Sequence, residues 1–265
     1  MRWRRKPLEE KDRIEAVETA LTKLNAGRAL APASGRRLET FELAECTLLR
    51  DPAEPTSPYY NRVKGFGPAA VGRLDDLLAV FGGRPPCFDM TPDRSTPEVA
   101  AALIRNGYAP MEQLAFLAAA PSPGAGGPQA PRFERVTTHT AETFVRWIGL
   151  SMGGRTFERA AVERALPYFH REDFLNYMLE IDGEPAAMGS LFLSGTAGYA
   201  ANDYTFERYR GRGLQGALIR QRLAEAAALG LEAVYTDVEF GSASHGNMLK
   251  AGFGTVFLNT FWLKR

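Results

Sequence analysis

A glycine-rich turn that runs directly into a long helix constrains the fold of this chain more than any other feature. The turn is Arg210-Gly211-Arg212-Gly213-Leu214-Gln215-Gly216, and the pattern predicts a helix over 213–229 that ends at Gly230. Glycines let the backbone approach a ligand closely, and the first turn of a helix presents unpaired N–H groups at the positive end of its dipole. The turn therefore predicts a binding site for an anion such as pyrophosphate.

The segments around this turn predict a mixed α/β domain. Strands are expected over 133–136, 174–181, 186–193, 197–206, 233–238 and 256–263. Helices are expected over 141–151, 157–169 and 244–251. Asp182-Gly183 favours a tight hairpin between the second and third strands. We therefore expect a mostly antiparallel sheet flanked by helices.

The same glycines permit a second interpretation. Gly211, Gly213 and Gly216 satisfy the G-x-G-x-x-G fingerprint of NAD and FAD sites, and Asp237 at a strand end could hold a ribose. A doubly wound dinucleotide fold normally starts with that turn and continues through several βα units, whereas here antiparallel hairpins precede it. A dinucleotide enzyme is therefore the second-ranked hypothesis.

Composition excludes several classes of function. Lys and Arg total 32 against 31 for Asp and Glu, so no basic field is present to attract nucleic acid. Cys46 and Cys87 lie in apolar, strand-like surroundings, which indicates reduced core thiols rather than a disulfide framework. His139 and His170 are isolated in the sequence, and no metal site is expected.

The N-terminal segment and the hydropathy pattern predict a cytoplasmic protein without a membrane partner. The basic residues at 1–6 are followed by an acidic helical segment over 8–26, where a signal peptide would need an apolar stretch. No apolar run approaches the roughly 18 residues that span a bilayer.

A Pro- and Gly-rich segment predicts the domain boundaries. Residues 121–131 have nothing to bury and should form a linker between an N-terminal domain, 1–120, and a C-terminal domain, 132–265. A helix, a glycine stop, an aromatic residue and a strand follow one another in 104–117 and again in 249–263. The echo favours two modules of one fold in tandem.

The C-terminal half resembles the GNAT acetyltransferase superfamily. The family's cofactor motif, Arg/Gln-x-x-Gly-x-Gly/Ala at the start of a helix, is matched by 210–215, with a departure at Gln215. The segment Ser244 to Phe253 looks like the family's closing helix with its Gly-Phe stop. The resemblance covers 133–265, and it implies a GNAT fold and acetyl-CoA as co-substrate.

The resemblance also implies which residues hold the cofactor. The pantetheine would lie beside the splayed end of the strand over 200–205, and the turn amides would hold the pyrophosphate. Asn247 would contact the pantetheine or cap the short helix. The cofactor residues expected on this basis are Tyr204, Thr205, Arg210, Gly211, Arg212, Gly213, Leu214, Gln215, Gly216, Ala217 and Asn247.

Catalytic groups are less well defined. The resemblance implies direct attack of an amine on the thioester in a ternary complex, so the amine must first lose a proton. Asp203 and Glu239, near the carboxyl ends of adjacent strands, are the candidate bases. The family's usual acid, a tyrosine, is replaced by Met248, so Ser244, Tyr204, a water or no acid at all would serve the leaving thiolate.

The N-terminal half looks like a degenerate copy. Its counterpart of the turn, Gly65-Phe66-Gly67-Pro68, lacks the arginine and places a proline among the amides, so no cofactor is expected there. The missing tyrosine and the degenerate half keep a non-catalytic acyl-CoA sensor as a third hypothesis. The expected acceptor is the primary amine of a small molecule, and the sequence indicates no oligomeric state.

Overall fold

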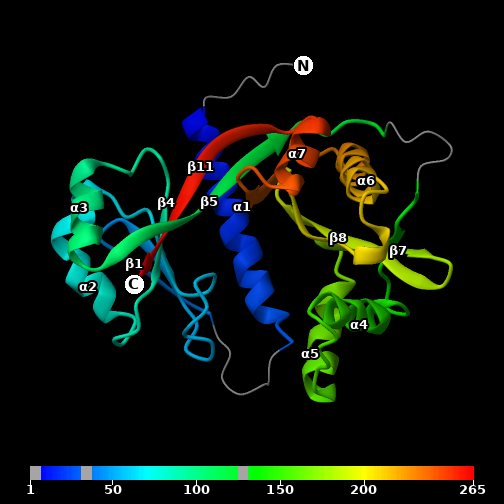
Figure 1. Ribbon diagram of the computed structural model, residues 1–265, viewed down its shortest axis with the longest axis horizontal. Helices are drawn as coiled ribbons and strands as arrows, with labels where there is room; N and C mark the ends of the chain where they lie inside the picture. Colours follow the sequence, from blue (N-terminus) through cyan, green and yellow to red (C-terminus); the bar gives the residue numbers. More distant parts are fainter. Residues whose placement is uncertain (1–6, 31–37, 125–130) are drawn as a thin grey trace. The chain divides into compact units, whose positions relative to one another are not determined.

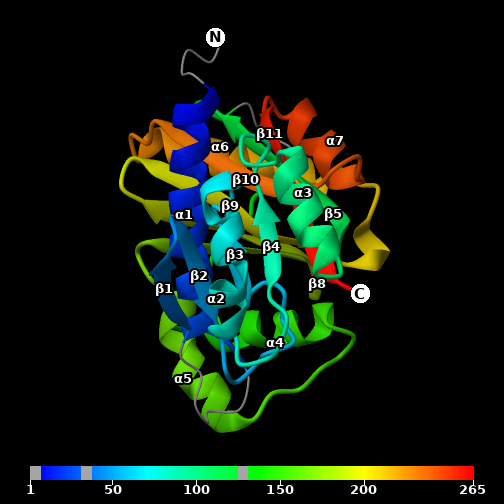
Figure 2. The ribbon, with the colours of Figure 1, turned by 90° about the vertical axis from the view of Figure 1, so that its left-hand side faces the viewer.

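The computed structural model describes residues 7–30, 38–124 and 131–265, and most of its elements are labelled in Figure 1 or Figure 2. Contacts divide the chain into two compact units. As far as they are described, Met1–Ala33, Leu117–Asp237 and Gly241–Val256 form the first unit. Ser34–Phe116, Val238–Phe240 and Phe257–Arg265 form the second. Both are α/β modules, and the predicted fold class, a mostly antiparallel sheet flanked by helices, is confirmed.

The strands of the first unit follow the predicted pattern. They are β6 (Glu134–Arg135), β7 (Phe174–Ile181), β8 (Glu184–Ser194), β9 (Ala197–Thr205) and β10 (Ala233–Glu239), in the order β10-β9-β8-β7-β6. Neighbours are antiparallel except β9 and β10, which run parallel. Asp182 and Gly183 have φ angles of 54° and 79°, as a tight two-residue hairpin requires, so the predicted β7–β8 turn is confirmed.

Helices cover both faces of this sheet. They are α1 (Pro7–Gly27), α4 (Ala141–Ser151), α5 (Arg159–Phe169), α6 (Leu214–Ala228) and α7 (Ala243–Lys250). Met188 of β8 packs in a core cluster with α4 and α5, whereas a Cβ on the next residue, Gly189, would meet Leu218 of α6. Because successive residues of a strand face opposite sides, α6 covers the face opposite to α4 and α5, and Figure 1 shows β7 and β8 between them.

The second unit is built on a six-strand order, β1-β2-β3-β4-β11-β5. Its strands are β1 (Glu39–Leu43), β2 (Cys46–Arg50), β3 (Arg62–Lys64), β4 (Cys87–Met90), β5 (Tyr108–Ala119) and β11 (Gly254–Lys264). A 3₁₀ helix, η1 (Pro68–Arg73), leads into α2 (Leu74–Ala79), and α3 (Pro97–Arg105) follows β4. Phe66, Phe88 and Leu103 pack in one buried cluster, and Figure 2 shows α2 and α3 on the same side of these strands.

The units differ from the contiguous domains expected at 1–120 and 132–265. Helix α1 belongs to the first unit, where Glu10 accepts a hydrogen bond from Tyr235 of β10 and Arg13 pairs with Glu232 at 3.3 Å. Residues 257–265 belong to the second unit, where Asn259 donates to Asp89 of β4. Of the expected linker, 121–131, residues 125–130 lie outside the described residues.

The internal echo in the sequence has a structural counterpart. Helix α3 is followed by Gly107, at φ 76°, and then by β5, while α7 is followed by Gly252, at φ 99°, and then by β11. Each of these two strands contributes residues to both units. The repeated order of helix, glycine and strand supports a tandem of two related modules.

Two further features complete the fold. The segment around 41–49 forms the β1–β2 hairpin, because Ala44 and Glu45 adopt φ angles of 52° and 62° and turn the chain. None of the described helices is both long and apolar enough to cross a membrane.

Candidate functional site

A cavity of about 710 Å³ lies where β9 ends and α6 begins in the first unit. Its walls are the carboxyl end of β9, the glycine-rich turn, the first turns of α6 and the helix α7. The expected cofactor residues that line it are Tyr204, Thr205, Arg210, Gly211, Gly213, Leu214, Gln215, Gly216 and Asn247. The candidate catalytic residues Asp203 and Ser244 line it too.

The glycines of the turn leave its backbone open. Gly211 and Gly213 both have φ angles of 75°, a conformation that side chains rarely adopt, and a Cβ on either would meet no atom within 4 Å. Gly213 precedes α6 directly, so the N–H groups of the first helical turn lack helical partners. These groups lie at the wall of the cavity. This open turn at a helix N-terminus fits a pyrophosphate group.

Positive side chains reinforce the turn. Arg210, Arg220 and Lys250 are exposed and line the cavity, and the Nε of Arg210 donates to the carbonyl oxygen of Thr205 at 3.2 Å. Gly216, one of the expected cofactor residues, also lines the cavity, where a Cβ would lie 3.4 Å from the guanidinium of Arg220. The electrostatic environment therefore favours a polyanionic ligand.

Two expected cofactor residues lie outside the cavity lining. The guanidinium of Arg212 lies over the ring of Tyr209, 5.1 Å from its centroid. Ala217 is buried and belongs to the apolar side of α6. Sequence spacing alone does not separate these residues from their neighbours, because their partners are set by tertiary packing.

Gln215 joins α6 to α7 at the cavity wall. Its Nε2 donates to Ser244 Oγ at 2.9 Å, and its Oε1 accepts from Asn247 Nδ2 at 2.8 Å. Gln215 stands where the resembling family has glycine or alanine, and both ends of its amide are used. The substitution therefore supplies a bridge that positions Ser244 and Asn247.

Strand β9 has an unpaired edge beside the cavity. Its ladder with β10 pairs Ala197–Tyr199 with Ala233–Tyr235. Within the described ladder, residues 200–205 pair on the other side only, with β8. The carbonyl oxygen of Ala200 still accepts from Thr236 Oγ1 of β10 at 2.9 Å, so the edge on which an extended ligand could pair lies beyond Ala200.

A β-bulge interrupts β9 within this edge. The register with β8 shifts between Met188 and Ser190, so Asn202 and Asp203 together oppose Gly189. Asn202 has a φ angle of 57°, which is unusual for a non-glycine residue. The bulge lies next to Tyr204 and Thr205 of the cavity lining, so it redirects the strand where the ligand would lie.

Asp203, a candidate base, is engaged by a buried cation. Its two carboxylate oxygens accept from the guanidinium of Arg222 at 2.5 and 2.7 Å, and the Arg222 side chain is 1% exposed. Both oxygens of Asp203 are committed to this pair, which argues for a structural role.

Glu239, the other candidate base, lies in the second unit. It lines a separate cavity of about 640 Å³ together with Glu112, Met111, Phe240 and other residues of β5 and β11. Met111 and Phe240 are each 50% exposed. Two carboxylates beside exposed apolar side chains favour an organic cation.

Met248 and His245 occupy α7 next to the candidate acid. Met248, at the position of the family's usual tyrosine, is 2% exposed and cannot donate a proton. His245 is buried, and its Nδ1 accepts from the backbone N–H of Gly241 at 3.2 Å. Both residues therefore belong to the packing of α7.

The turn at 65–68 in the second unit is closed. Phe66 is fully buried, and a Cβ on Gly67 would lie 3.0 Å from the Arg94 side chain. Pro68 begins η1 and supplies no N–H. These three features differ from the open turn at Gly211 and Gly213.

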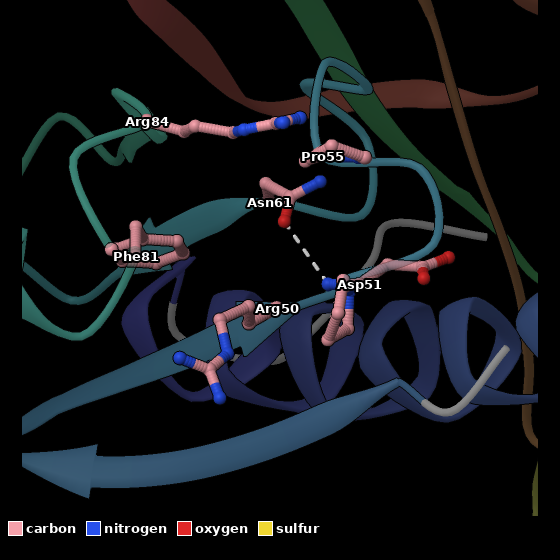
Figure 3. Close-up of a pocket in the computed structure, with 8 residues that line it drawn as sticks. Arg50, Asp51, Pro55, Asn61, Phe81 and Arg84 are labelled. Atoms are coloured by element: carbon pink, nitrogen blue, oxygen red, sulfur yellow. Dashed lines mark hydrogen bonds between the residues drawn. The ribbon is translucent and has the colours of Figure 1, made fainter. Parts of the chain in front are cut away.

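A third cavity, of about 320 Å³, lies in the second unit between β2 and the loop after α2 (Figure 3). The Asn61 amide is consumed within the chain: its oxygen accepts from the N–H of Asp51 at 3.0 Å, and its nitrogen donates to two carbonyls. Arg50 is paired with Glu39 at 2.6 Å. The lining thus holds the 51–61 loop in place.

Metal binding has no support among the described residues, which contain no group of His, Cys, Asp and Glu suited to a metal ion. The thiols of Cys46 and Cys87 are buried and free. Burial raises the pKa of the Cys46 thiol to about 11 and raises that of Cys87 further. Both fit the expected reduced core thiols.

Part of the chain matches a known protein family. Residues 141–253, which include the glycine-rich turn, β9 and α7, match the sequence model of the acetyltransferase (GNAT) family. This part of the chain is a GNAT domain. No curated protein matches the chain.

Solved structures with this fold cover nearly the whole chain. A GCN5-related N-acetyltransferase from Kribbella flavida has a TM-score of 0.64 at 14% identity, over 94% of both chains. A protein of unknown function from Staphylococcus epidermidis gives 0.62 at 9% identity, over 86% of this chain and 94% of its own. A tandem GNAT protein of the clavulanic acid pathway gives 0.52 at 14% identity, over 94% of both chains, which supports the tandem arrangement.

Proposed function

We propose that this protein transfers an acetyl group from acetyl-CoA to a primary amine of a small-molecule acceptor. The observation that carries the proposal is the cavity of the first unit, where the open turn at Gly211 and Gly213, exposed cations and the unpaired edge of β9 come together. The match of this segment to an acetyltransferase family supports an acyl-CoA ligand over a dinucleotide.

The cavity offers candidate partners for the pyrophosphate and the pantetheine of the donor. The amides between Gly211 and Gly216 would bind the pyrophosphate, and Arg210, Arg220 and Lys250 would add charge. The edge of β9 over 201–205 would bind the pantetheine by backbone pairing. Asn247, held by Gln215, would add a side-chain contact.

The chain's own residues would orient the reactants and manage protons. Acetyl-CoA supplies a thioester whose carbonyl carbon an amine can attack directly in a ternary complex. Backbone N–H groups at the bulge of β9 would favour negative charge on the carbonyl oxygen. Ser244 accepts its hydrogen bond from Gln215, so its own O–H remains available to protonate the departing sulfur.

The acceptor would be an amine with an apolar body. An aliphatic amine is cationic at neutral pH, and it suits carboxylates beside exposed Met111 and Phe240 in the cavity of the second unit. Glu239 would attract the ammonium through its negative charge. No nucleic acid or membrane is part of the proposal.

A turnover experiment tests this function. Wild-type protein is incubated with acetyl-CoA and tyramine, putrescine or glucosamine, and both free thiol and the acetylated amine are measured. Equal yields of thiol and amide with at least one amine would support the transferase. Thiol without amide would indicate hydrolysis, which contradicts amine transfer.

A non-catalytic acyl-CoA sensor is the second candidate, because the buried Met248 replaces the family's acid. Binding of CoA without any thiol release from the amine panel would favour the sensor. The two candidates share the donor cavity and differ in turnover alone.

A further inference from the structure

A single buried guanidinium contacts both strands at the β9 bulge. Arg222 of α6 is 1% exposed, and besides Asp203 it donates to the carbonyl oxygens of Ser190 at 2.8 Å and Ala201 at 3.5 Å. Asp203 is also shielded, at 13% exposure. Burying an ion pair often stabilises a fold no more than well-packed apolar residues would, so stability alone does not account for this pair.

Gly189 provides the space for this pair. A Cβ at Gly189 would lie 2.8 Å from Asp203 Oδ1 and 2.6 Å from Leu218 Cδ2. No positive φ is recorded for Gly189, so space rather than backbone conformation requires the glycine. The residue of β8 that opposes the bulge is therefore the one that lets Asp203 reach Arg222.

The opposite side of the bulge is held as well. The Asn202 side chain donates to Ser190 Oγ at 3.3 Å and accepts from Arg28 at 3.2 Å. Arg28, just after α1, lies over the rings of Phe169 and Phe174, at 5.6 and 5.2 Å from their centroids. Both residues of the bulge, Asn202 and Asp203, are thus fixed by arginines from different helices.

We propose that the Asp203–Arg222 pair is a positioning device that fixes the bulge of β9 for the acyl group, and that Asp203 is not the general base. The inference rests on the proposed function and adds that α6, which begins at the phosphate-binding turn, also sets the shape of the strand that meets the thioester. The turn and the bulge would then be aligned by one rigid helix.

The test compares Arg222→Met, Asp203→Asn and Gly189→Ala with wild type. Gly198→Ala is the matched control, because its Cβ would also be crowded, at 2.9 Å from Leu191, but away from the bulge. Hydrogen exchange of the 200–205 backbone is measured by mass spectrometry without ligand. Thiol release from acetyl-CoA is measured with tyramine and with water as acceptor, across the pH range where carboxylates and amines titrate.

If the pair fixes the bulge, hydrogen exchange at 200–205 should be faster in Arg222→Met and Gly189→Ala than in wild type. Exchange in β7 should not change, and Gly198→Ala should behave like wild type. Turnover should fall about 100-fold in Arg222→Met, as for a misplaced reacting group, with unchanged acetyl-CoA affinity. Asp203→Asn keeps an oxygen for Arg222, so it should lose less activity and keep the pH profile.

Two results would overturn the proposal. If the backbone amides of 200–205 exchange as slowly in Arg222→Met and Gly189→Ala as in wild type, the Asp203–Arg222 pair does not fix the bulge. Loss of the acidic limb of the pH profile in Asp203→Asn, where a general base becomes protonated, would make Asp203 the base. The exchange measurement needs no ligand, so it decides the positioning claim even if the protein does not transfer acetyl groups.

Discussion

Gln215 Nε2 donates to Ser244 Oγ at 2.9 Å, which joins the first turn of α6 to the first turn of α7 across the cavity wall. Asn247 donates to the other end of the same amide at 2.8 Å. The wall of the site is therefore held by one side chain.

Gln215→Ala should weaken CoA binding because both contacts to α7 are lost. We expect CoA affinity to fall by about tenfold, equivalent to about 1.4 kcal/mol, measured by calorimetric titration. Gln221→Ala is the matched control: Gln221 also makes two hydrogen bonds, to the backbone of Phe133 at 2.8 and 2.9 Å. Equal CoA affinity of the two variants would contradict the role of Gln215.

Ser244→Ala should lower turnover without lowering stability. If Ser244 protonates the departing thiolate, its loss should reduce kcat by about 100-fold, with an unchanged denaturation midpoint. Ser242→Ala separates the effects, because Ser242 caps α7 by accepting from His245 N–H at 3.1 Å. That variant should lose about 1 kcal/mol of stability and keep its kcat. An unaltered kcat in Ser244→Ala would show that Ser244 is not the general acid.

Glu239→Gln should raise the KM for the amine and leave the KM for acetyl-CoA unchanged, because Glu239 lines the cavity of the second unit. Glu112→Gln should act in the same direction, while Glu184→Gln, at an exposed carboxylate that begins β8, should not. Steady-state kinetics with tyramine measure these effects. An effect on acetyl-CoA instead of the amine would contradict the assignment.

Cys46 should make stability fall at alkaline pH. Burial raises the pKa of its thiol from 9.0 to about 11, so the folded state holds the proton more tightly than the unfolded chain. Its contribution is complete below the unfolded value and is lost as pH rises from 9.0 towards about 11. Urea midpoints should therefore fall less steeply over this range in Cys46→Ala. If the urea midpoints of wild type and Cys46→Ala fall equally steeply with pH, the raised pKa of the Cys46 thiol is contradicted.

The elements predicted best from sequence are those with strong local signals. Asp182 and Gly183 mark the β7–β8 hairpin because both accept positive φ, and Gly230 and Gly252 end their helices for the same reason. The turn at 44–45 was missed because Ala44 and Glu45 carry no such signature, yet they adopt φ angles of 52° and 62°. Pairing between β1 and β2 overrides their local preference.

The sequence predicts the backbone turn of the site, but it does not predict which side chains of the site pair with one another. The turn at 210–216 follows from glycine spacing, whereas the partnership of Asp203 with Arg222 depends on α6 crossing β9, which no local pattern records. Gly189 carried a usable signal: it is a glycine inside an apolar strand, which suggests a bulge or a close approach. The place of α1 in the first unit depends on long-range contacts such as Glu10 with Tyr235.

The most direct test of acetyl-CoA binding is a thermal-shift titration of wild type and Gly213→Glu with acetyl-CoA, CoA, NADH and FAD. Gly153→Glu is the control, because Gly153 also has a positive φ, 79°, and open space around it, but does not line the cavity. At a hundredfold excess over Kd, binding stabilises the folded state by about 2.7 kcal/mol. We predict shifts with acetyl-CoA and CoA alone, retained in Gly153→Glu and lost in Gly213→Glu. A shift with NADH or FAD but not with CoA would contradict the account.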